Sequence, residues 1–486
     1  MLARAVTHAL VGLEPQRVEV EAHLQELAAP AFGIVGLADR ACQEAKERVK
    51  IGVKSAELQW PKGRVVVNLA PAELRKEGSS FDLPIALAVL AASFQVPGDA
   101  LARHAAVGEL ALDGRLRPVG GVLAVAEGAR RARLPRILCP ADCAAEAALA
   151  GIDAVPVRHL AEAVAYLRGE RDPPPAPERN GCAPPPLADL AEVRGQERAR
   201  RALEIAAAGA HNLLLAGPPG TGKTMLARRL PSILPPLGDD EALEVTRIHS
   251  VAGVLAAGHP LVASRPFRAP HHTASAAAIV GGGPSLRPGE ATLAHHGVLF
   301  LDELAEFDRR ALESLRQPLE DGVISIARAA GRVTFPAQFQ LVAAMNLCAC
   351  GGRGDPGREC KCSAQRLERY RDKLSRALLD RFDLVVTVPR SRAHELATAS
   401  SQGSEGVRPR VVAARERLRR ATIPATPAAD DLLSRAVDRL PLSARGRTRV
   451  ARVAATIAAL AGAEAVDADH VAEALAYRTP KELADA

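Results

Sequence analysis

The chain has 486 residues, which is too long for one hydrophobic core, so two or three domains are expected. Its formal net charge of +7 comes from 63 basic and 56 acidic side chains, a balance that permits an anionic partner without requiring one. Aromatic residues make up only 3%, which argues against nucleic-acid binding mainly by base stacking. No run approaches the roughly 18 apolar residues of a membrane span, and the N-terminus lacks a signal-peptide pattern, so a cytoplasmic protein is expected.

The first 170 residues have the pattern of an α+β domain. Two segments alternate or run apolar in the manner of β-strands, RVEVEAHL at residues 17–24 and RVVVNLA at residues 64–70. Residues 39–54 carry the charge spacing of a helix, and a hairpin is expected over residues 107–119. These elements predict a self-contained domain at residues 1–170.

Two segments of this domain, KEGSSFD and GELALDGRLRPVGG, resemble the proteolytic domain of Lon-type proteases, which use a serine and a lysine. The resemblance places the serine at Ser80 but puts Val125 at the position of the lysine. A serine without a base to take its proton is a poor nucleophile. A protease-like fold without protease activity is therefore expected, with Ser80 as a cap of the following helix.

The remainder of the chain divides into a linker and two further domains. Residues 171–188 are rich in proline and poor in periodic apolar residues, which predicts an extended, semi-rigid linker. Residues 189–392 contain short apolar strands separated by helical patterns, and helical patterns fill most of residues 393–486. The predicted fold is multidomain α/β: an N-terminal α+β domain, a central P-loop domain with a parallel sheet, and a C-terminal helical lid.

A nucleotide-phosphate loop is the strongest motif in the chain, at residues 212–224, NLLLAGPPGTGKT. An apolar strand delivers a glycine-rich turn whose backbone N–H groups can approach an anion at the start of the next helix. Lys223 is expected to contact the β- and γ-phosphates of ATP, and Thr224 to place its hydroxyl on Mg²⁺. The residues expected to hold the phosphates are Gly217, Pro218, Pro219, Gly220, Thr221, Gly222, Lys223 and Thr224.

Two further strands end in polar residues that suit the same site. The strand at residues 298–301 ends in Asp302 and Glu303, which places one carboxylate near Mg²⁺ and another where it can orient an attacking water. The strand at residues 339–345 ends in Asn346, whose amide is expected to hold that water or to sense the γ-phosphate. Many ordinary strands also end in such residues, but the preceding phosphate loop favours the catalytic interpretation.

Arg381 lies in LLDRFDLVV, just before another strand. An arginine at this place can reach the γ-phosphate held by a neighbouring subunit, as an arginine finger does. The alternative is a local ion pair with Asp380 or Asp383. The finger is favoured because the other parts of a hydrolytic site are present, and it predicts an assembly of identical subunits.

Four of the eight cysteines crowd into one segment, as Cys348 and Cys350 followed by Cys360 and Cys362. Two short arms of thiolates can close a tetrahedral zinc site, and the glycine-rich residues between them can bend. The alternative is four free thiols, since C-x-C arms are less common in zinc sites than C-x₂-C arms. A structural Zn²⁺ is predicted here. The ungrouped cysteines, expected to be ordinary thiols, are Cys42, Cys139, Cys143 and Cys182.

Together these segments resemble the AAA+ superfamily, and longer strings narrow the resemblance. FRAPHHTAS, GGGPSLRPGEATLAHHGVLFLDELAEF, LRQPLEDG and LLDRFDL are similar to the magnesium-chelatase-like ComM/YifB family. The resemblance covers nearly the whole chain. It implies a homo-hexameric branch-migration helicase that uses ATP and Mg²⁺, acts on branched or single-stranded DNA, and serves recombination of DNA taken up in natural transformation.

The resemblance also implies two insertions in the central domain. One falls within residues 252–290, and the other is a hairpin at residues 323–339 that would line the pore of a ring. Arg328 and Arg332 flank the turn of the hairpin and are expected to contact DNA phosphates, with a solvated hairpin tip as the alternative. The match to the sensor-2 helix of the superfamily places Arg445 over the γ-phosphate.

His271 and His272 stand next to each other within the first insertion. Adjacent residues of an extended segment point to opposite sides, so hydrogen-bonded or pore-facing histidines are expected rather than a metal-binding pair.

Three other functions fit parts of the sequence. A magnesium-chelatase-type motor that drives metal insertion into a porphyrin is the main alternative, and the Lon-like domain and the cysteine cluster argue against it. Val125 argues against a Lon-type protease. The combination of Lys223, Asp302, Glu303 and Arg381 argues against a non-catalytic DNA-binding protein, so an ATP-driven DNA motor is expected.

Overall fold

The computed structural model describes residues 1–172, 187–255, 259–283, 286–328, 331–392, 395, 402–440 and 442–478. Most of the predicted linker lies outside the described residues, and so do Cys182, Ala329 and Ala330. The chain forms two compact units, one of Met1–Pro184 with Asp239–Ala263 and one of Pro185–Gly238 with Ser264–Ala486. Among the helices of the described ranges, none is both long and apolar enough to cross a membrane.

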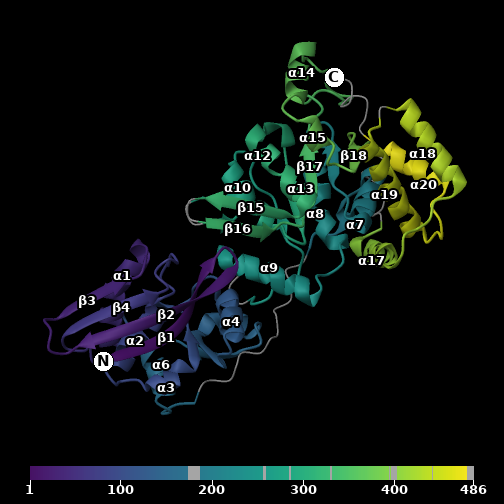
Figure 1. The fold of residues 1–486 in the computed structure, drawn as a ribbon. Helices are drawn as coiled ribbons and strands as arrows, with labels where there is room; N and C mark the ends of the chain where they lie inside the picture. The colour runs from purple at the N-terminus through teal and green to yellow at the C-terminus, as the bar shows by residue number, and fades with distance from the viewer. Residues whose placement is uncertain are drawn as a thin grey trace. The chain divides into compact units, whose positions relative to one another are not determined.

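The first unit is built on a seven-stranded mixed sheet (Figure 1). Its elements are β1 (Leu2–Val11), β2 (Glu14–Gln25), β3 (Ala31–Val35), α1 (Arg40–Ser55), β4 (Arg64–Ala70), α2 (Asp82–Ala92), α3 (Gly98–Ala102), β5 (His104–Ala106), β6 (Glu109–Leu110), β7 (Leu116–Arg117), α4 (Val122–Arg131), β8 (Arg136–Pro140), α5 (Ala144–Ala148), β9 (Asp153–Val157) and α6 (Leu160–Leu167). The strand order is β3-β4-β2-β1-β5-β8-β9, with antiparallel pairs only between β1 and β2 and between β2 and β4. The predicted hairpin is present as β6 and β7.

Helix α2 begins differently from the expectation. Its N-cap residue is Phe81, which makes no side-chain cap hydrogen bond, so the prediction that Ser80 caps this helix is wrong. The polar contacts of the first turn come instead from the buried Asp82, which accepts from Arg48 Nε at 2.6 Å and from Leu110 N at 3.2 Å. Burial raises the pKa of Asp82, and Arg48 opposes that shift.

Helix α9 (Asp239–Ala252) follows the phosphate-loop helix in the chain but belongs to the first unit. Ser250 fixes it there, because its hydroxyl donates to Glu146 and accepts from Gly121 N at 2.9 Å. The same carboxylate accepts from Leu123 N at 2.8 Å. Burial raises the pKa of Glu146, while these hydrogen bonds lower it. The segment of the first unit that interrupts the second therefore starts before the predicted insertion.

The second unit contains a five-stranded sheet in which all strands are parallel (Figure 1). Its elements up to the last strand are α7 (Glu197–Gly209), β10 (Leu213–Ala216), α8 (Lys223–Ile233), β11 (Phe267–Arg268), α10 (Ala276–Val280), β12 (Gly281–Gly282), β13 (Arg287–Pro288), α11 (Glu290–Leu293), β14 (Val298–Leu301), α12 (Arg309–Ser314), α13 (Arg316–Asp321), β15 (Val323–Arg328), β16 (Gly331–Pro336), β17 (Gln340–Met345), α14 (Ala364–Arg371), α15 (Arg376–Leu379) and β18 (Leu384–Thr387). The order β11-β14-β17-β10-β18 brings the carboxyl ends of β10, β14 and β17 together at one edge. Every residue of these three strands is buried, as expected of a parallel sheet covered on both faces. The predicted multidomain α/β class with a parallel sheet is confirmed.

Within the described residues 402–440 and 442–478, four helices pack on this sheet unit (Figure 1). They are α17 (Ser404–Arg420), α18 (Pro427–Arg439), α19 (Ala444–Ala461) and α20 (Ala468–Ala476). Apolar residues of these helices share one buried cluster with residues of α7 and β10. Polar contacts reinforce it: Thr456 Oγ1 lies 2.8 Å from His211 Nε2, and Arg415 Nε donates to Ala207 O at 2.7 Å.

Candidate functional site

A cavity of about 440 Å³ lies where β10, β14 and β17 end. Its lining includes residues 219–225, Asp302, Glu303 and Asn346. The predicted phosphate-loop, carboxylate and amide residues therefore meet at one place. Ligands of parallel α/β sheets bind at this edge, because the loops after the strands open there.

The phosphate loop passes so close to β18 that a side chain cannot fit at its start. A Cβ atom on Gly217 would lie 2.2 Å from Val388 O. Lys223 stabilises the same turn from within, because its Nζ donates to Gly217 O at 2.8 Å and to Pro218 O at 2.7 Å. Its third partner is Asn346 Oδ1 at 3.3 Å, which links the loop to the end of β17.

Lys223 is a buried cation whose three hydrogen-bond partners are neutral oxygen atoms. Only 8% of the surface of Lys223 is exposed. Burial lowers its pKa, and the charge of Asp302 opposes that shift. Removing an ammonium group from water is unfavourable unless a counter-charge lies nearby, so the site favours an anion beside Lys223.

Thr224 and Asp302 form the second polar contact of the cavity. The Thr224 hydroxyl donates to Asp302 Oδ2 at 2.7 Å, and the other oxygen of Asp302 accepts from Glu303 N at 2.9 Å. A hydroxyl and a carboxylate at this separation are the hard oxygen ligands that Mg²⁺ prefers.

Glu303 has an unusual backbone conformation and an unexpected partner. Its φ of 53° lies in the left-handed region, which is rare for a residue with a side chain and is concentrated at functional sites. Its carboxylate lies 3.3 Å from His272 Nδ1. The rings of His271 and His272 have centroids 4.1 Å apart, so the prediction that they point apart is wrong. The chain turns at His272 and Thr273 instead of remaining extended.

A second cavity of about 310 Å³ adjoins the other side of the phosphate loop. Its lining shares Gly220, Thr221 and Gly222 with the first cavity and adds Val193 and Gln196 from the segment before the loop. Sequence reasoning missed this pocket, because no local pattern connects a segment near residue 193 with the turn at residue 220.

Arg381 and Arg445, the arginines predicted to act at the γ-phosphate, are not part of the lining of either cavity. Both instead approach the carboxylate of Glu320, at the end of α13. Arg381 forms an ion pair with it, and Arg445 Nη2 lies 3.7 Å from the same oxygen. Three segments distant in sequence therefore meet at one acid, and the roles of the two arginines stay predictions.

Asp383 connects the sheet to α19, a contact that the sequence did not indicate. Its buried carboxylate accepts from Asn212 N at 3.0 Å and from Arg452 Nη2 at 3.0 Å. Burial alone would raise the pKa of Asp383, but the contacts with His211 and Arg452 outweigh it and hold the pKa below its ordinary value. The partner of Arg381 is therefore the distant Glu320, and the adjacent Asp383 pairs with Arg452.

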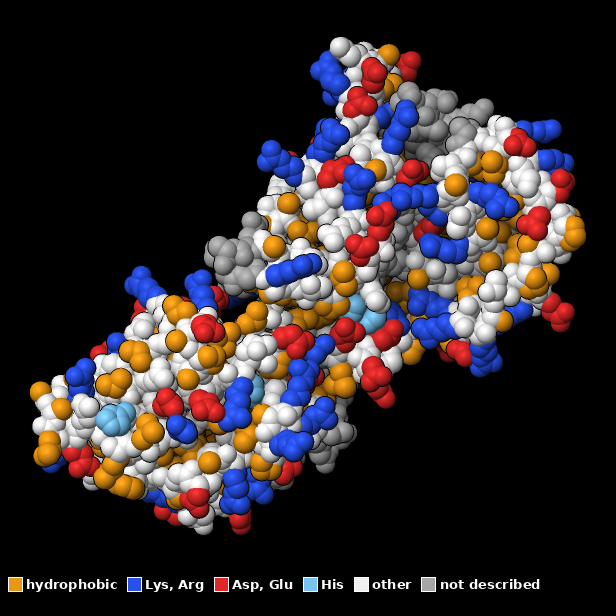
Figure 2. Space-filling view, viewed as in Figure 1, with side chains coloured by type: hydrophobic (Ala, Val, Ile, Leu, Met, Phe, Trp, Pro, Cys, Tyr) orange, Lys and Arg blue, Asp and Glu red, His pale blue; other side chains and the backbone are white. Residues whose placement is uncertain are grey.

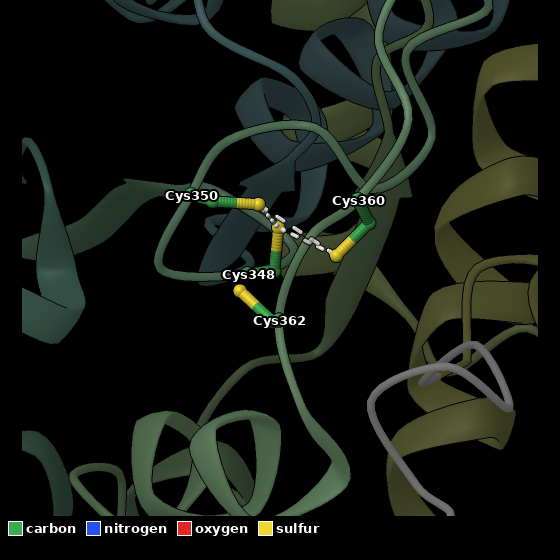
Figure 3. Close-up of side chains that lie close together, drawn as sticks. All are labelled: Cys348, Cys350, Cys360 and Cys362. Atoms are coloured by element: carbon green, nitrogen blue, oxygen red, sulfur yellow. Dashed lines mark hydrogen bonds between the residues drawn. The ribbon is translucent and has the colours of Figure 1, made fainter.

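The four clustered cysteines converge on one point (Figure 3). Their sulfur atoms all lie within 4.8 Å of one another, and Cys348 Sγ is 3.4 Å from Cys350 Sγ and 3.6 Å from Cys360 Sγ. Arg353 N donates to Cys348 Sγ at 3.3 Å. Backbone N–H groups also lower the pKa of Cys350 to about 6. The four predicted ligands are thus brought together, and their donor set is compatible with a structural zinc site.

Family models and full-length relatives match this chain. Residues 189–396 match the model for magnesium chelatase, subunit ChlI; residues 19–143 match subunit ChlI of Mg-chelatase; and residues 401–478 match the C-terminal model of that subunit. The competence protein ComM of Haemophilus influenzae is 40% identical over 499 residues, covering 98% of this chain and 97% of that protein. The uncharacterized protein YifB of Salmonella typhimurium is 40% identical over 495 residues, with coverage of 98% and 97%. An uncharacterized protein of Mycobacterium tuberculosis is 45% identical over 499 residues, with 98% of each chain covered.

The chain belongs to the magnesium-chelatase-like ComM/YifB family. The AAA+ character of this family implies ATP and Mg²⁺ as cofactors. The residues present fit that pair. A buried ammonium group with neutral partners suits a polyphosphate, and the adjacent oxygens of Thr224 and Asp302 suit the cation that accompanies it.

The hairpin predicted from the ComM/YifB resemblance is present as β15 and β16. Its strands pair from Val323 opposite Pro336 to Arg328 opposite Gly331. The side chain of Arg332 is exposed. Apolar residues hold the base of the hairpin to the sheet unit, because Ile324 and Phe335 are buried at 4% and 0% exposure.

Proposed function

We propose that the protein is an ATPase whose hydrolysis site is the cavity at the ends of β10, β14 and β17. The observation that carries the proposal is the meeting there of Lys223, the Thr224–Asp302 pair, Glu303 and Asn346. A phosphate loop alone is a nucleotide-binding feature. The carboxylate of Glu303, beside the Mg²⁺-binding oxygens of Thr224 and Asp302, adds the base that hydrolysis needs.

Each residue has one task in this proposal. Lys223 offsets phosphate charge, and Thr224 and Asp302 hold the cation. Glu303 orients the attacking water and accepts its proton, which requires release from His272, 3.3 Å away. Asn346, whose side chain already accepts a hydrogen bond from Lys223, senses whether the γ-phosphate is present and transmits that difference to β17. ATP, when bound, supplies the phosphoanhydride bond whose hydrolysis drives movement.

The site is proposed to be completed by a neighbouring subunit in a homo-hexamer. Arg381 and Arg445 share Glu320 and stand outside the cavity lining of their own chain. Two further arginines lie near Asp380 and Asp383, the acids on either side of Arg381 and Phe382: burial lowers the pKa of Arg449 and of Arg478, and the charges of these two acids oppose that shift. Such a concentration of guanidinium groups suits the phosphates of an adjacent subunit.

The proposed substrate of the motor is DNA, as branched or single-stranded forms, and the proposed process is branch migration in recombination of incoming DNA. The name of the Haemophilus influenzae relative, competence protein ComM, supports a competence-related role. Acidic and basic side chains are interspersed on the visible face of the molecule (Figure 2). We assign the DNA contact to the exposed Arg332 of the β15–β16 hairpin, and Arg328, on the paired strand, stays a predicted contact.

The Lon-like resemblance of the first unit is proposed to concern its fold alone. Val125 is 2% exposed and lies in the apolar cluster around α4, and its alkyl side chain cannot take a proton from Ser80. The helices α17 to α20 are proposed to act as the lid of the motor, because Arg452 couples α19 to Asp383 at the start of β18.

A magnesium-chelatase-type motor is the second candidate, since the three matching family models carry that name. Both candidates require ATP hydrolysis. They differ in their substrate, because a chelatase motor drives metal insertion into a porphyrin whereas a helicase acts on DNA.

The ATPase rate of the purified chain, measured with and without forked and four-way DNA, tests the proposal. We expect stimulation by branched DNA, and an unchanged rate would refute the DNA assignment. Glu303→Gln is the matched variant, because it keeps the shape of the side chain but removes the base. It should bind ATP normally and lose at least about a hundredfold in turnover, within the usual contribution of a general base. Retained turnover would move the water-orienting role to another residue.

A further inference from the structure

We propose that Cys348, Cys350, Cys360 and Cys362 bind one Zn²⁺ ion, and that the loop closed by this metal braces the phosphate loop and Asn346. The site would be a metal centre that controls the geometry of the nucleotide pocket. The bracing part of this inference rests on the proposed function, whereas the metal part does not.

The spacing of the sulfur atoms fits a metal rather than disulfides. Tetrahedral ligands at about 2.3 Å from zinc lie about 3.8 Å from one another. The closest pairs here, among Cys348, Cys350 and Cys360, are 3.4, 3.6 and 3.7 Å apart. These separations exceed the roughly 2.05 Å of a disulfide, and the four thiols are free. On binding, each thiol would release its proton to solvent, giving a tetrathiolate of net charge −2.

The backbone around the first arm is arranged as for thiolates. Arg353 N donates to Cys348 Sγ at 3.3 Å, and Gly351 and Gly354 both have positive φ angles, 75° and 77°. These turns fold the segment between the arms back toward its start. N–H groups directed at sulfur stabilise negative charge on it, which a metal-bound thiolate carries.

The folded segment lies directly against the phosphate loop. A Cβ atom added to Gly351 would lie 2.8 Å from Pro219 Cγ, and one added to Gly354 would lie 4.0 Å from Pro218 Cγ. Two glycines of the cysteine loop therefore face the two prolines of the phosphate loop. Because proline rings are rigid parts of the backbone, displacement of the cysteine loop would also displace the phosphate-binding N–H groups.

The second arm is linked to the same pocket through helix α14. Ser363, next to Cys362, caps helix α14, and Tyr370 on that helix donates its hydroxyl to Asn346 O at 3.1 Å. Tyr370 is 6% exposed. Asn346 is thus held on one side by the chain that leads to Cys348 and on the other by the helix that follows Cys362. The metal would fix both supports with one ion.

Zinc content and nucleotide binding of the full-length chain test the two parts separately. We expect one zinc per purified wild-type chain by elemental analysis, and a thiolate-to-cobalt charge-transfer band after replacement with Co²⁺. Cys360→Ser should lose the metal and weaken binding of a fluorescent ATP analogue at least about tenfold. Residues that hold the ligands of a site in place, without contacting the bound group, typically contribute effects of this size. The control is Cys143→Ala, which alters a thiol of the first unit and should keep both properties.

Cys362→His keeps the proposal testable if Cys360→Ser misfolds, because histidine is also a zinc ligand. This variant should retain zinc and bind the ATP analogue within about threefold of wild type. Wild-type protein that binds neither zinc nor cobalt would overturn the metal site. Loss of zinc with unchanged nucleotide affinity would overturn the bracing. Failure of the wild type to bind ATP would refute the proposed function and the bracing, while the zinc measurement would still stand.

Discussion

Replacement of Gly351 by alanine should weaken ATP binding, although Gly351 itself is not part of the lining of the nucleotide cavity. The added Cβ would lie 2.8 Å from Pro219 Cγ and 3.0 Å from Pro219 Cδ. Carbon atoms prefer separations of about 3.5–4.0 Å, so Pro219 must move by roughly 0.7–1 Å. A misplacement of about 1 Å in a catalytic site can lower the rate about a hundredfold. We expect a loss of similar size in ATP affinity, about 10- to 100-fold, or about 1.4–2.7 kcal/mol.

Gly354→Ala is the matched control, because the φ angles of the two glycines are 75° and 77°. Both variants bear the left-handed backbone penalty of about 1–2 kcal/mol for a residue with a Cβ. At Gly354 the new atom meets the flexible end of Leu347 at 3.0 Å and Pro218 only at 4.0 Å. Calorimetric titration with an ATP analogue should show less than about a threefold loss for the control. Equal affinities of the two variants would refute the proposed contact.

Three further predictions concern other parts of the chain. Arg381→Ala and Lys223→Ala should each abolish ATPase activity. An equal mixture of the two should recover up to about a quarter of it, because a site in a mixed ring is restored where one variant supplies Lys223 and its neighbour supplies Arg381. No recovery would contradict the shared site. Arg332→Ala should weaken DNA binding and reduce its log–log salt slope by about 1, measured by fluorescence anisotropy, and an unchanged slope would remove Arg332 from the DNA contact. Burial lowers the pKa of His8 to about 4. Since the unfolded value is about 6.5, the unfolded chain binds the extra proton between these values, and the first unit should lose up to about 3 kcal/mol as pH falls through that window. His8→Phe should flatten the fall of the melting temperature from pH 7 to pH 4, and equal slopes would count against His8.

The nucleotide site could be predicted from the sequence because its parts follow local rules. A buried strand, a glycine turn and a helix start make the phosphate loop visible in one stretch. Asp302 and Asn346 each follow another buried strand, and parallel strands bring their carboxyl ends to one edge. The cysteine cluster was visible for the same reason, because its spacing lies within one short segment.

Contacts between distant segments could not be predicted in this way. Arg381, Arg445 and Glu320 come from three separate segments, and no local sequence pattern in any of them indicates contact with the other two. Asp383 pairs with Arg452, which composition alone would assign to a solvated helix face. His272 reaches Glu303 because the chain turns locally, whereas alternation assumes extended backbone.

The contact between the cysteine loop and the phosphate loop also lacks a sequence signal. It depends on the absence of a Cβ at Gly351, and glycine is common in loops simply because it adopts positive φ angles without strain. Helix α9 gives a similar case, since Ser250 bonds to Glu146 of the first unit across more than a hundred residues of sequence. Both contacts depend on residues that are distant in sequence, so neither can be inferred from the local sequence.

Strand exchange on branched DNA tests the central claim most directly. Purified chain would be incubated with ATP and Mg²⁺ on three-stranded, four-way and plain duplex DNA of equal length, with Glu303→Gln as the control. We expect strand displacement on the branched substrates by the wild type, little on the plain duplex, and none by the variant. Wild-type protein that hydrolyses ATP but displaces no strand from any of the three substrates would contradict the assignment as a DNA motor.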